Sequence, residues 1–164
     1  MTYKKNSVTI CILVPHELIR GGSEKYIQFK NREKSKGEEV MENSDRISKS
    51  IEVLHENLNT VVSVKDWAQL MHFSCPKEFA RKFQRCFEVR PYAYLKYIRL
   101  KKISEELRES NRSNFEIARK YGVSDEIALN KYINYHMDCS PTEIKMMQEI
   151  QLKKKFEKFG SKVR

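Results

Sequence analysis

Cysteine is sparse in this sequence, and its four copies form no recognisable motif. Cys11, Cys75, Cys86 and Cys139 include no CxxC or CxxxC pair, and no histidine stands at ligand spacing from them. The pattern therefore indicates neither a zinc site nor a disulfide framework, and it fits reduced thiols in the cytosol. We expect no metal and no other cofactor.

Long apolar runs are also missing. The stretch VTICILV, residues 8–14, is too short to cross a bilayer. Lysines precede it, as in a secretory signal, but Pro15, His16 and Glu17 follow where a small-residue cleavage site would stand. A short strand is the favoured interpretation of this stretch, and we expect no association with a membrane.

No catalytic set can be assembled from the residues that usually supply one. His16, His55, His72 and His136 lie on different predicted elements, and none stands near a serine or cysteine in a catalytic motif. A chain of 164 residues can bury one core of ordinary size or two small ones, which is too little for a large enzyme. We therefore do not expect an enzyme.

Basic residues, by contrast, are in excess. Lys and Arg number 32 against 22 Asp and Glu, which gives a net charge of +10. Such an excess points to nucleic acid or another anionic surface as the partner. The alternative, that the charge serves solubility alone, stays open at this point.

Residues 1–45 are predicted to form an N-terminal extension and linker. Two β-like pieces, residues 8–14 and 25–29, flank the turn signal RGGS, and a charged stretch poor in apolar residues covers residues 30–45. The periodicity then becomes helical, and an amphipathic helix is expected to begin near the cap candidate Ser44. Its apolar face recurs at steps of four, three and four: Ile47, Ile51, Leu54 and Leu58.

Two later stretches follow one pattern. SVKDWAQLMHFS, residues 63–74, is followed at an offset of fifty residues by SNFEIARKYGVS, residues 113–124. Each opens with a capping box, carries an apolar pair, and ends in a turn that closes on a serine before a second helix. The pattern predicts a helix-turn-helix unit at about 63–87 and its duplicate at about 113–137. The capping pairs are Ser63 with Asp66 and Ser113 with Glu116.

A connecting helix is predicted between the two units, over residues 91–109. Leu100, Ile103 and Leu107 lie on one of its faces. At 1.5 Å per residue such a helix is about 28 Å long, enough to hold the two units about one turn of DNA apart. The prediction is thus an all-α fold with two helix-turn-helix subdomains joined by a long helix.

Charged side chains on the connecting helix have two possible roles. Arg99, Lys101 and Lys102 either line a DNA-facing surface or pair with carboxylates of the same helix. Glu105 and Glu106 stand four residues after the two lysines, and this spacing favours ion pairs.

The domain is predicted to cover residues 46–145 and to be followed by a basic helical tail, residues 146–164. A third capping box with proline at the first helical position, Ser140 to Glu143, starts a final helix that runs into this tail. The tail lysines either add salt-sensitive affinity for DNA or belong to a disordered segment. These lysines are Lys153, Lys154 and Lys155.

The second helix of the first unit is strongly basic on its outward face. Phe79, Phe83 and Cys86 are assigned to the inward face. One outward cation alone is equally well explained as a solvated residue, but four on one helix after such a turn favour DNA. The predicted roles are base reading for Arg81 and Lys77 and phosphate contact for Lys82 and Arg85.

The second helix of the second unit offers fewer polar groups. Leu129 and Ile133 face inward, and Asp125 and Glu126 favour the helix dipole but disfavour phosphate. We therefore expect the first unit to supply most of the sequence discrimination and the second mostly affinity and positioning. The residues left to meet DNA are Ile127, Ala128, Asn130, Lys131 and Asn134, the first two by apolar contact.

Taken together, these features resemble a known family. Two helix-turn-helix units joined by a helix, with LRESN leading into IARKYG and then SPTEIK, are similar to the DNA-binding domain of the AraC/XylS transcription regulators, most of all the short MarA, SoxS and Rob group. The resemblance covers about residues 46–145. It implies seven helices and a monomer that binds asymmetric promoter sites, with its reading helices in successive major-groove segments. The contact positions it implies are Lys77, Ala80, Arg81, Ile127, Ala128, Asn130 and Lys131.

The leading hypothesis is therefore a sequence-specific bacterial transcription regulator, cytoplasmic and associated with the nucleoid. The resemblance implies that it brings RNA polymerase to promoters as an activator. The alternative is a non-enzymatic interaction module with a degenerate helix-turn-helix fold that binds RNA polymerase or another regulator. Residues 1–45 are too few for the sugar-binding barrel of many relatives, so no ligand pocket is predicted.

Overall fold

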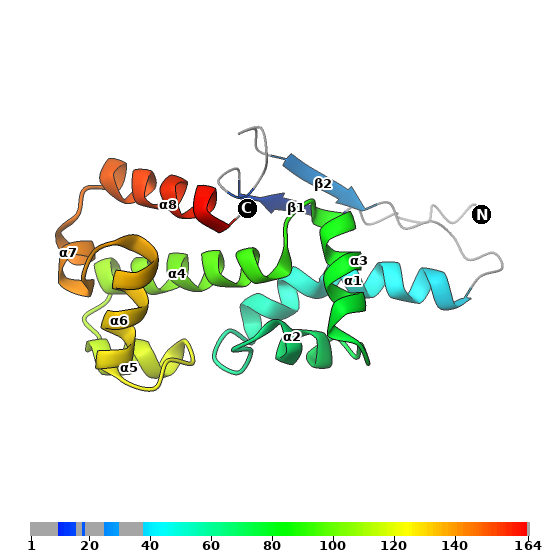
Figure 1. Cartoon of the computed structure of the whole chain (residues 1–164), viewed down its shortest axis with the longest axis horizontal. Coiled ribbons are helices and arrows are strands. Elements are labelled where there is room, and N and C mark those ends of the chain that lie inside the picture. The colour runs from blue at the N-terminus through cyan, green and yellow to red at the C-terminus, as the bar shows by residue number, and fades with distance from the viewer. Residues whose placement is uncertain (1–9, 16–17, 19–24, 30–37, 164) are drawn as a thin grey trace, which may run out of the picture.

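The computed structural model describes residues 10–15, 18, 25–29 and 38–163. A two-stranded antiparallel hairpin comes first, and the helices of the described part follow it (Figure 1). The strands are β1 (Ile10–Val14) and β2 (Lys25–Phe29), and the helices are α1 (Glu38–Glu56), α2 (Val64–Leu70), α3 (Pro76–Phe87), α4 (Pro91–Glu109), α5 (Asn114–Lys120), α6 (Glu126–Met137), α7 (Pro141–Met146) and α8 (Glu149–Val163). No helix among these residues is both long and apolar enough to span a membrane.

The predicted fold class is confirmed, and so are the two predicted strands. Helices α2 and α3 form the first helix-turn-helix unit, α5 and α6 form the second, and α4 joins them over the residues that the sequence predicted. The described part has eight helices, one more than the family resemblance implied. The predicted turn RGGS and residues 30–37 of the predicted linker lie outside the described residues.

The backbone structure repeats at the same offset of fifty residues. Each helix of the second unit begins and ends fifty residues after its counterpart in the first, and α7 begins fifty residues after α4. The backbone turns follow the same rule, because left-handed conformations occur in pairs at the same offset. They are His72 with φ 57° and Gly122 with φ 70°, then Glu88 with φ 58° and Asp138 with φ 52°.

Capping boxes begin both units, as predicted. The hydroxyl of Ser63 accepts a hydrogen bond from the backbone N–H of Asp66, and the Asp66 carboxylate accepts one from the backbone N–H of Ser63. Ser113 and Glu116 make the same pair of bonds at the start of α5. These reciprocal bonds satisfy backbone donors that the first turn leaves without partners, which is why the two helices begin at equivalent residues.

The first unit is built around one tryptophan. Trp67 is fully buried, and its ring lies 5.2 Å from that of Phe79 and 4.9 Å from that of Phe83, both on α3. Its indole N–H donates to the carbonyl of Ser50 on α1 at 3.0 Å. This residue therefore connects three helices, and the ring of Tyr94 on α4 lies beside it in a tilted arrangement, with ring centroids 6.3 Å apart.

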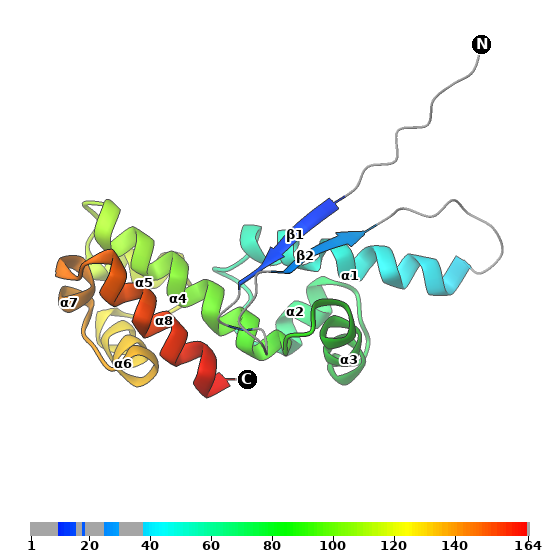
Figure 2. The ribbon, with the colours of Figure 1, turned by 90° about the horizontal axis from the view of Figure 1, so that it is seen from above.

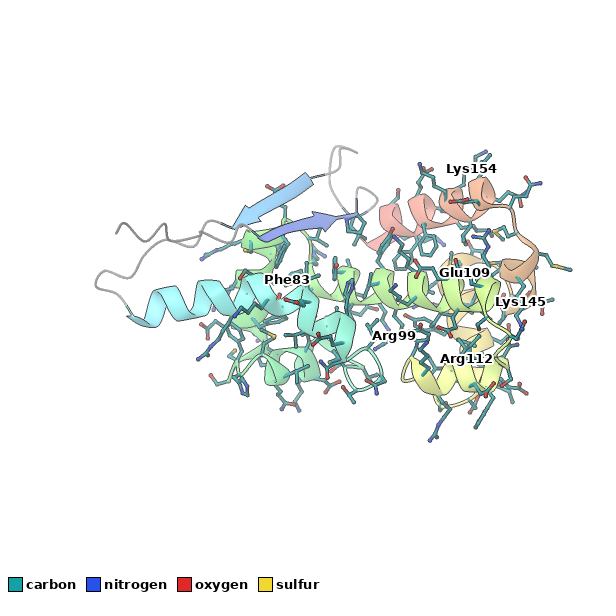
Figure 3. The ribbon with its side chains drawn as sticks, turned by 180° about the vertical axis from the view of Figure 1, so that it is seen from behind. Phe83, Arg99, Glu109, Arg112, Lys145 and Lys154 are labelled. Carbon is teal, nitrogen blue, oxygen red and sulfur yellow. The ribbon has the colours of Figure 1, made fainter. Side chains whose placement is uncertain are left out.

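A buried arginine stands where the two units meet (Figure 3). Arg99 of α4 is only 2% exposed, and its guanidinium donates to the carbonyls of Leu58 and Val61 in the loop between α1 and α2. Both predicted roles for Arg99 were therefore wrong, because its side chain is buried in the core and one of its terminal nitrogens donates to these two carbonyls. A Cβ added at Gly122 would lie 2.8 Å from the carbonyl oxygen of Asn59, so the turn of the second unit packs directly on the same loop.

Two helix boundaries differ from the prediction. Helix α1 begins at Glu38, so Ser44 lies inside it and is not its cap. The residues before Ser44 include several glutamates, which form helix well and favour its N-terminal end. The final helix does not run on into the tail, because Met147 adopts an extended conformation with φ −74° and ψ 136° and ends α7.

Helix α8 is a separate element that packs back on the domain. Leu152, Phe156 and Phe159 are buried, and α8 contacts both α4 and α6. The ring of Phe156 lies 5.4 Å from that of Tyr97 on α4, and the ring of Phe159 lies 5.5 Å from that of His136 on α6. The alternative of a disordered tail was therefore wrong for residues 149–163, because their apolar side chains complete the core.

Candidate nucleic-acid interface

The second helices of the two units lie on the same long side of the molecule. In Figure 2, α3 and α6 both lie at the lower edge, and most of α1 and the C-terminal end of α4 lie on the opposite side. Each of the two helices buries one face in its own unit and leaves the other exposed. This arrangement presents two helix surfaces in one direction.

Helix α3 is anchored by three phenylalanines and exposes a stripe of cations. The helix begins at Pro76. The buried side chains of Phe79, Phe83 and Phe87 determine which face of α3 points into the core. Lys77, Arg81 and Arg85 are all exposed. Because they stand four residues apart, they lie along one line on the helix surface. The inward assignment of Phe79 and Phe83 is confirmed, whereas Cys86 is only half-buried.

Lys82 is more constrained than the other three cations of α3. Its ammonium lies 2.6 Å from the carboxylate of Glu78 and 5.4 Å from the centre of the Phe73 ring. The hydrogen bond from Lys82 holds the pKa of Glu78 below its usual range. A phosphate that binds Lys82 must therefore compete with Glu78. Ala80, on the same turn, is half-buried.

Helix α6 exposes a very different stripe. Ile127 is 65% exposed, Lys131 is exposed, and Tyr135 is 79% exposed. These three residues stand fifty positions after Lys77, Arg81 and Arg85, so an apolar, a basic and an aromatic residue replace three cations. Sequence reasoning missed Tyr135. Its spacing of four from Lys131 and its offset of fifty from Arg85 were the signals that would have found it.

The polar groups of α6 are partly engaged with one another. The side-chain amide of Asn134 donates to the side-chain carbonyl of Asn130 at 2.8 Å. At the start of the helix, the carboxylate of Asp125 accepts from the backbone N–H of Ala128 at 2.7 Å. That bond lowers the pKa of Asp125, which stays ionised at neutral pH. Both asparagines are exposed, whereas Ala128 is half-buried.

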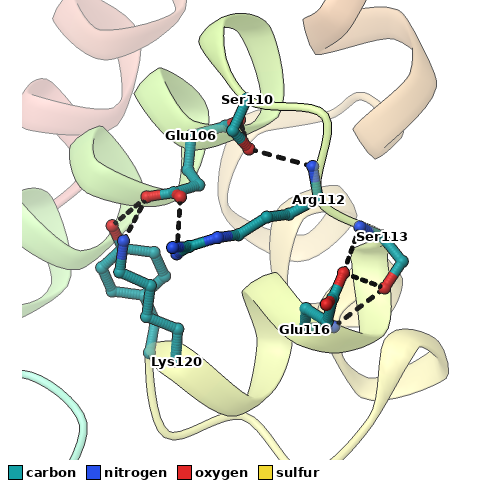
Figure 4. A network of polar contacts seen from close by, with 7 residues as sticks. Glu106, Ser110, Arg112, Ser113, Glu116 and Lys120 are labelled. Atoms are coloured by element: carbon teal, nitrogen blue, oxygen red, sulfur yellow. Dashed lines mark hydrogen bonds and ion pairs between the residues drawn. The ribbon is translucent and has the colours of Figure 1, made fainter.

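An ion network fixes the second unit on the connecting helix (Figure 4). The carboxylate of Glu106 on α4 lies 2.6 Å from the ammonium of Lys120 and 2.9 Å from the guanidinium of Arg112, and it accepts a hydrogen bond from Tyr121 at 3.0 Å. Lys120 is the main cause that lowers the pKa of Glu106. Lys102 instead pairs with Glu105 at 3.0 Å, so its predicted pairing with Glu106 was wrong. Lys102 and Glu105 stand three residues apart, a spacing that also permits an ion pair on a helix. Glu106 instead pairs with Arg112 and Lys120, which lie outside α4.

Among the described residues, no group of three His, Cys, Asp or Glu side chains is placed to hold a metal ion. The candidate site is the surface made by the outward faces of α3 and α6.

Comparisons with known proteins give a match over the two helix-turn-helix units. A family model described as "Helix-turn-helix domain" matches residues 67–147. No curated protein is similar enough in sequence to count as a match.

Solved structures of transcriptional and response regulators share the fold. A transcriptional regulator with an AraC-type DNA-binding domain from Chromobacterium violaceum is 18% identical, with a TM-score of 0.51, and the match covers 63% of this chain and 92% of that one. The DNA-binding domain of AdpA, solved in complex with a target DNA, is 21% identical with a TM-score of 0.53, covering 62% and 90%. The C-terminal domain of AraT, a response regulator from Geobacillus stearothermophilus, is 17% identical with a TM-score of 0.54, covering 63% and 88%.

Proposed function

Since residues 67–147 form a helix-turn-helix domain and the chain has the fold of AraC-type DNA-binding domains, we propose that this protein is a sequence-specific DNA-binding transcription regulator. The observation that carries the proposal is the pair of exposed stripes, which occupy equivalent positions on α3 and α6 and lie on one side of the molecule. The AdpA domain, which has this fold, was solved with a target DNA. Two helices so arranged fit successive segments of the major groove of one duplex.

The proposed contacts follow from exposure and charge. Arg81 and Lys77 read base edges, for which a guanidinium bidentate to guanine is the commonest specific contact. Arg85 and Lys82 contact phosphates, Lys82 in competition with Glu78. On α6 the proposed contacts are Ile127, Ala128, Asn130, Lys131 and Asn134, to which the exposure of Tyr135 adds a further one.

The finer parts of the function come from the sequence resemblance. We propose a monomer on an asymmetric promoter site that activates transcription by recruiting RNA polymerase, in the cytoplasm and on the nucleoid. The likeness to the MarA, SoxS and Rob group stays a prediction. The division into residues 1–45, 46–145 and 146–164 likewise stays a prediction.

A second candidate function is favoured by the apolar character of α6. Exposed Ile127 and Tyr135 suit contact with a protein surface as well as with thymine methyl groups or sugars. The chain would then be an interaction module that binds RNA polymerase or another regulator without reading DNA sequence. Comparing affinities for a mapped site and for random DNA separates the two functions.

The experiment begins with genome-wide mapping of bound sites, followed by fluorescence anisotropy on one mapped duplex and one random duplex. Arg81→Ala should weaken binding to the mapped site by about 1–3 kcal/mol and relax the preference at a single base pair, because one base-reading side chain is removed. Affinity for random DNA should fall much less.

The matched control is Arg108→Ala, which removes the same charge from an exposed position near the C-terminal end of α4. Figure 2 shows this end of the helix on the side opposite α3 and α6. It should bind both duplexes almost as the unmodified protein does. Equal affinity of the unmodified protein for mapped and random DNA would contradict the proposed regulator and favour the interaction module.

A further inference from the structure

The reading helix of the second unit lacks most of the cations that its counterpart carries. Helix α3 has cations at positions 77, 81, 82 and 85, and only Lys131 is kept at the four equivalent positions of α6. Phosphate contacts supply much of the affinity of such proteins for DNA. The second unit therefore needs cations from another element if it is to hold its segment of DNA.

Helix α8 brings lysines to the C-terminal end of α6. The ammonium groups of Lys158 and Lys162 lie 2.9 and 3.2 Å from the same carboxylate oxygen of Asp138, the residue that ends α6. Lys155 donates to the backbone carbonyl of Asp138 at 2.9 Å. One carboxylate thus faces two ammonium groups, which leaves an excess of positive charge. The side chains of Lys158 and Lys162 are 62% and 47% exposed.

Helix α8 is packed firmly on the domain, and its C-terminal end lies toward the candidate interface. Phe156 against Tyr97 and Phe159 against His136 hold the helix on α4 and α6. In both views, the C-terminal end of α8 lies between α6 and α3 along the long axis, and Figure 2 puts it on the same side as these helices. Helix α8 follows the residues that match the family model.

We propose that Lys158 and Lys162 bind the phosphate backbone of DNA at the C-terminal end of α6 and supply the phosphate contacts that α6 itself lacks. This inference rests on the proposed function. A helix in the major groove is flanked by sugar-phosphate backbones, so cations grouped at its end meet phosphates. Phosphate oxygens accept charge-assisted hydrogen bonds from ammonium groups as the carboxylate of Asp138 does, so phosphates can take its place.

The test measures how affinity depends on salt. Lys158→Gln combined with Lys162→Gln should reduce the slope of log affinity against log salt by about 1.8, because each phosphate contact contributes about 0.9. Between 50 and 200 mM salt, this variant should lose about tenfold less affinity than the unmodified protein does. The reduction should be the same on mapped and random duplexes.

The matched control is Lys153→Gln combined with Lys154→Gln. It removes the same charge from exposed positions of the same helix, and Lys154 lies on the outer edge of α8, away from α4 (Figure 3). The inference gives the salt-sensitive affinity expected of the tail lysines to Lys158 and Lys162, which lie at the end of α6, and not to Lys153 and Lys154. The salt slope of the control should therefore stay close to that of the unmodified protein. Equal slopes for the Lys158/Lys162 variant and the unmodified protein would overturn the proposal, as would equal reductions in both double variants.

A further variant separates phosphate binding from bracing of α6. Asp138→Asn removes the competing carboxylate and keeps a residue that tolerates the left-handed backbone at this position. If the lysines bind phosphate, this variant should bind DNA as tightly as the unmodified protein or a few-fold more tightly. If they serve only to hold α6 in place, binding should weaken, and the inference fails.

The proposed function and this inference fail in different ways. An unmodified protein that does not prefer its mapped sites would remove the proposed sequence reading. A protein that prefers them and keeps its full salt slope without Lys158 and Lys162 would leave the function standing and remove the inference alone.

Discussion

The two helix-turn-helix units have the same backbone arrangement but differ in most of their side chains. Both begin with a capping box and both place left-handed residues at equivalent turns. The interior of the first is mainly aromatic, centred on Trp67, Phe79 and Phe83, whereas aliphatic residues take the equivalent places of the two phenylalanines in the second, Leu129 and Ile133. The same caps, turns and buried positions therefore serve both units, and the core tolerates different apolar side chains.

The exposed faces differ as much as the interiors do. Helix α3 carries its own cations, whereas α6 carries mainly apolar, amide and aromatic groups. The charged partners of the second unit lie outside it: Glu106 of α4 pairs with Arg112 and Lys120, and lysines of α8 meet Asp138. The first unit is thus suited to independent reading of DNA, and the second depends on its surroundings. Substitutions at equivalent places in the two units test this difference.

The largest effect is expected in the core of the first unit. Trp67→Ala should lower the free energy of unfolding by about 3–5 kcal/mol, because a fully buried ring and its hydrogen bond to Ser50 are lost. Urea unfolding followed by circular dichroism measures the loss. The comparison variant in the second unit, Ile133→Val, should cost only about 0.5–1.5 kcal/mol, since it removes one buried methylene. A smaller cost for Trp67→Ala than for Ile133→Val would contradict the central place of the tryptophan.

The turn residues should respond with opposite signs in the two units. Gly122→Ala should destabilise by about 2 kcal/mol or more, because the left-handed backbone disfavours a Cβ and this one would lie 2.8 Å from the carbonyl oxygen of Asn59. His72→Gly should leave stability unchanged or raise it by up to about 1 kcal/mol, since relief at the left-handed residue is offset by a more flexible unfolded chain. Urea titration of both variants checks the signs. A Gly122→Ala variant as stable as the unmodified protein would show that the second turn does not press on the loop before α2.

Local signals predicted much of this fold. The capping boxes and the offset of fifty residues placed the helices of both units, and Pro91 marked the start of α4. The start of α1 at Glu38 was missed because the charged residues before Ser44 show no apolar periodicity. The break at Met147 was missed because no glycine or proline marks it. That break follows from the burial of Phe156 and Phe159, which lie too far along the chain for local patterns to reveal.

Contacts between distant segments set the limit of the sequence prediction for the candidate site. The exposed stripe of α3 could be predicted from helical periodicity, because three phenylalanines define the buried face of this helix. Tyr135 was missed because an aromatic residue in an amphipathic helix is more often part of the core. The contacts of Lys158 and Lys162 with Asp138 could not be predicted from local patterns, since 20 and 24 residues separate these lysines from Asp138 in the sequence. Arg99 was misassigned for the same reason, because its acceptors lie on another segment.

The smallest effect concerns the caps of the two reading helices, where the units differ by one side chain. Asp125 caps α6 by accepting from the backbone N–H of Ala128, whereas Cys75 at the start of α3 makes no such bond. Cys75→Asp should therefore raise the free energy of unfolding by about 1 kcal/mol, by supplying the missing acceptor.

Asp125→Ala should lower the free energy of unfolding, because it removes the cap of α6. The pKa of Asp125 is depressed by its hydrogen bond, so its contribution is present above the ordinary carboxyl pKa and is lost as pH falls through the folded value. The difference between Asp125→Ala and the unmodified protein should accordingly shrink in acid, which urea unfolding at neutral and acidic pH measures. A gap that stays constant down to low pH would mean that the carboxylate does not cap α6, and the contrast between the two helix starts would then lie elsewhere than in the cap.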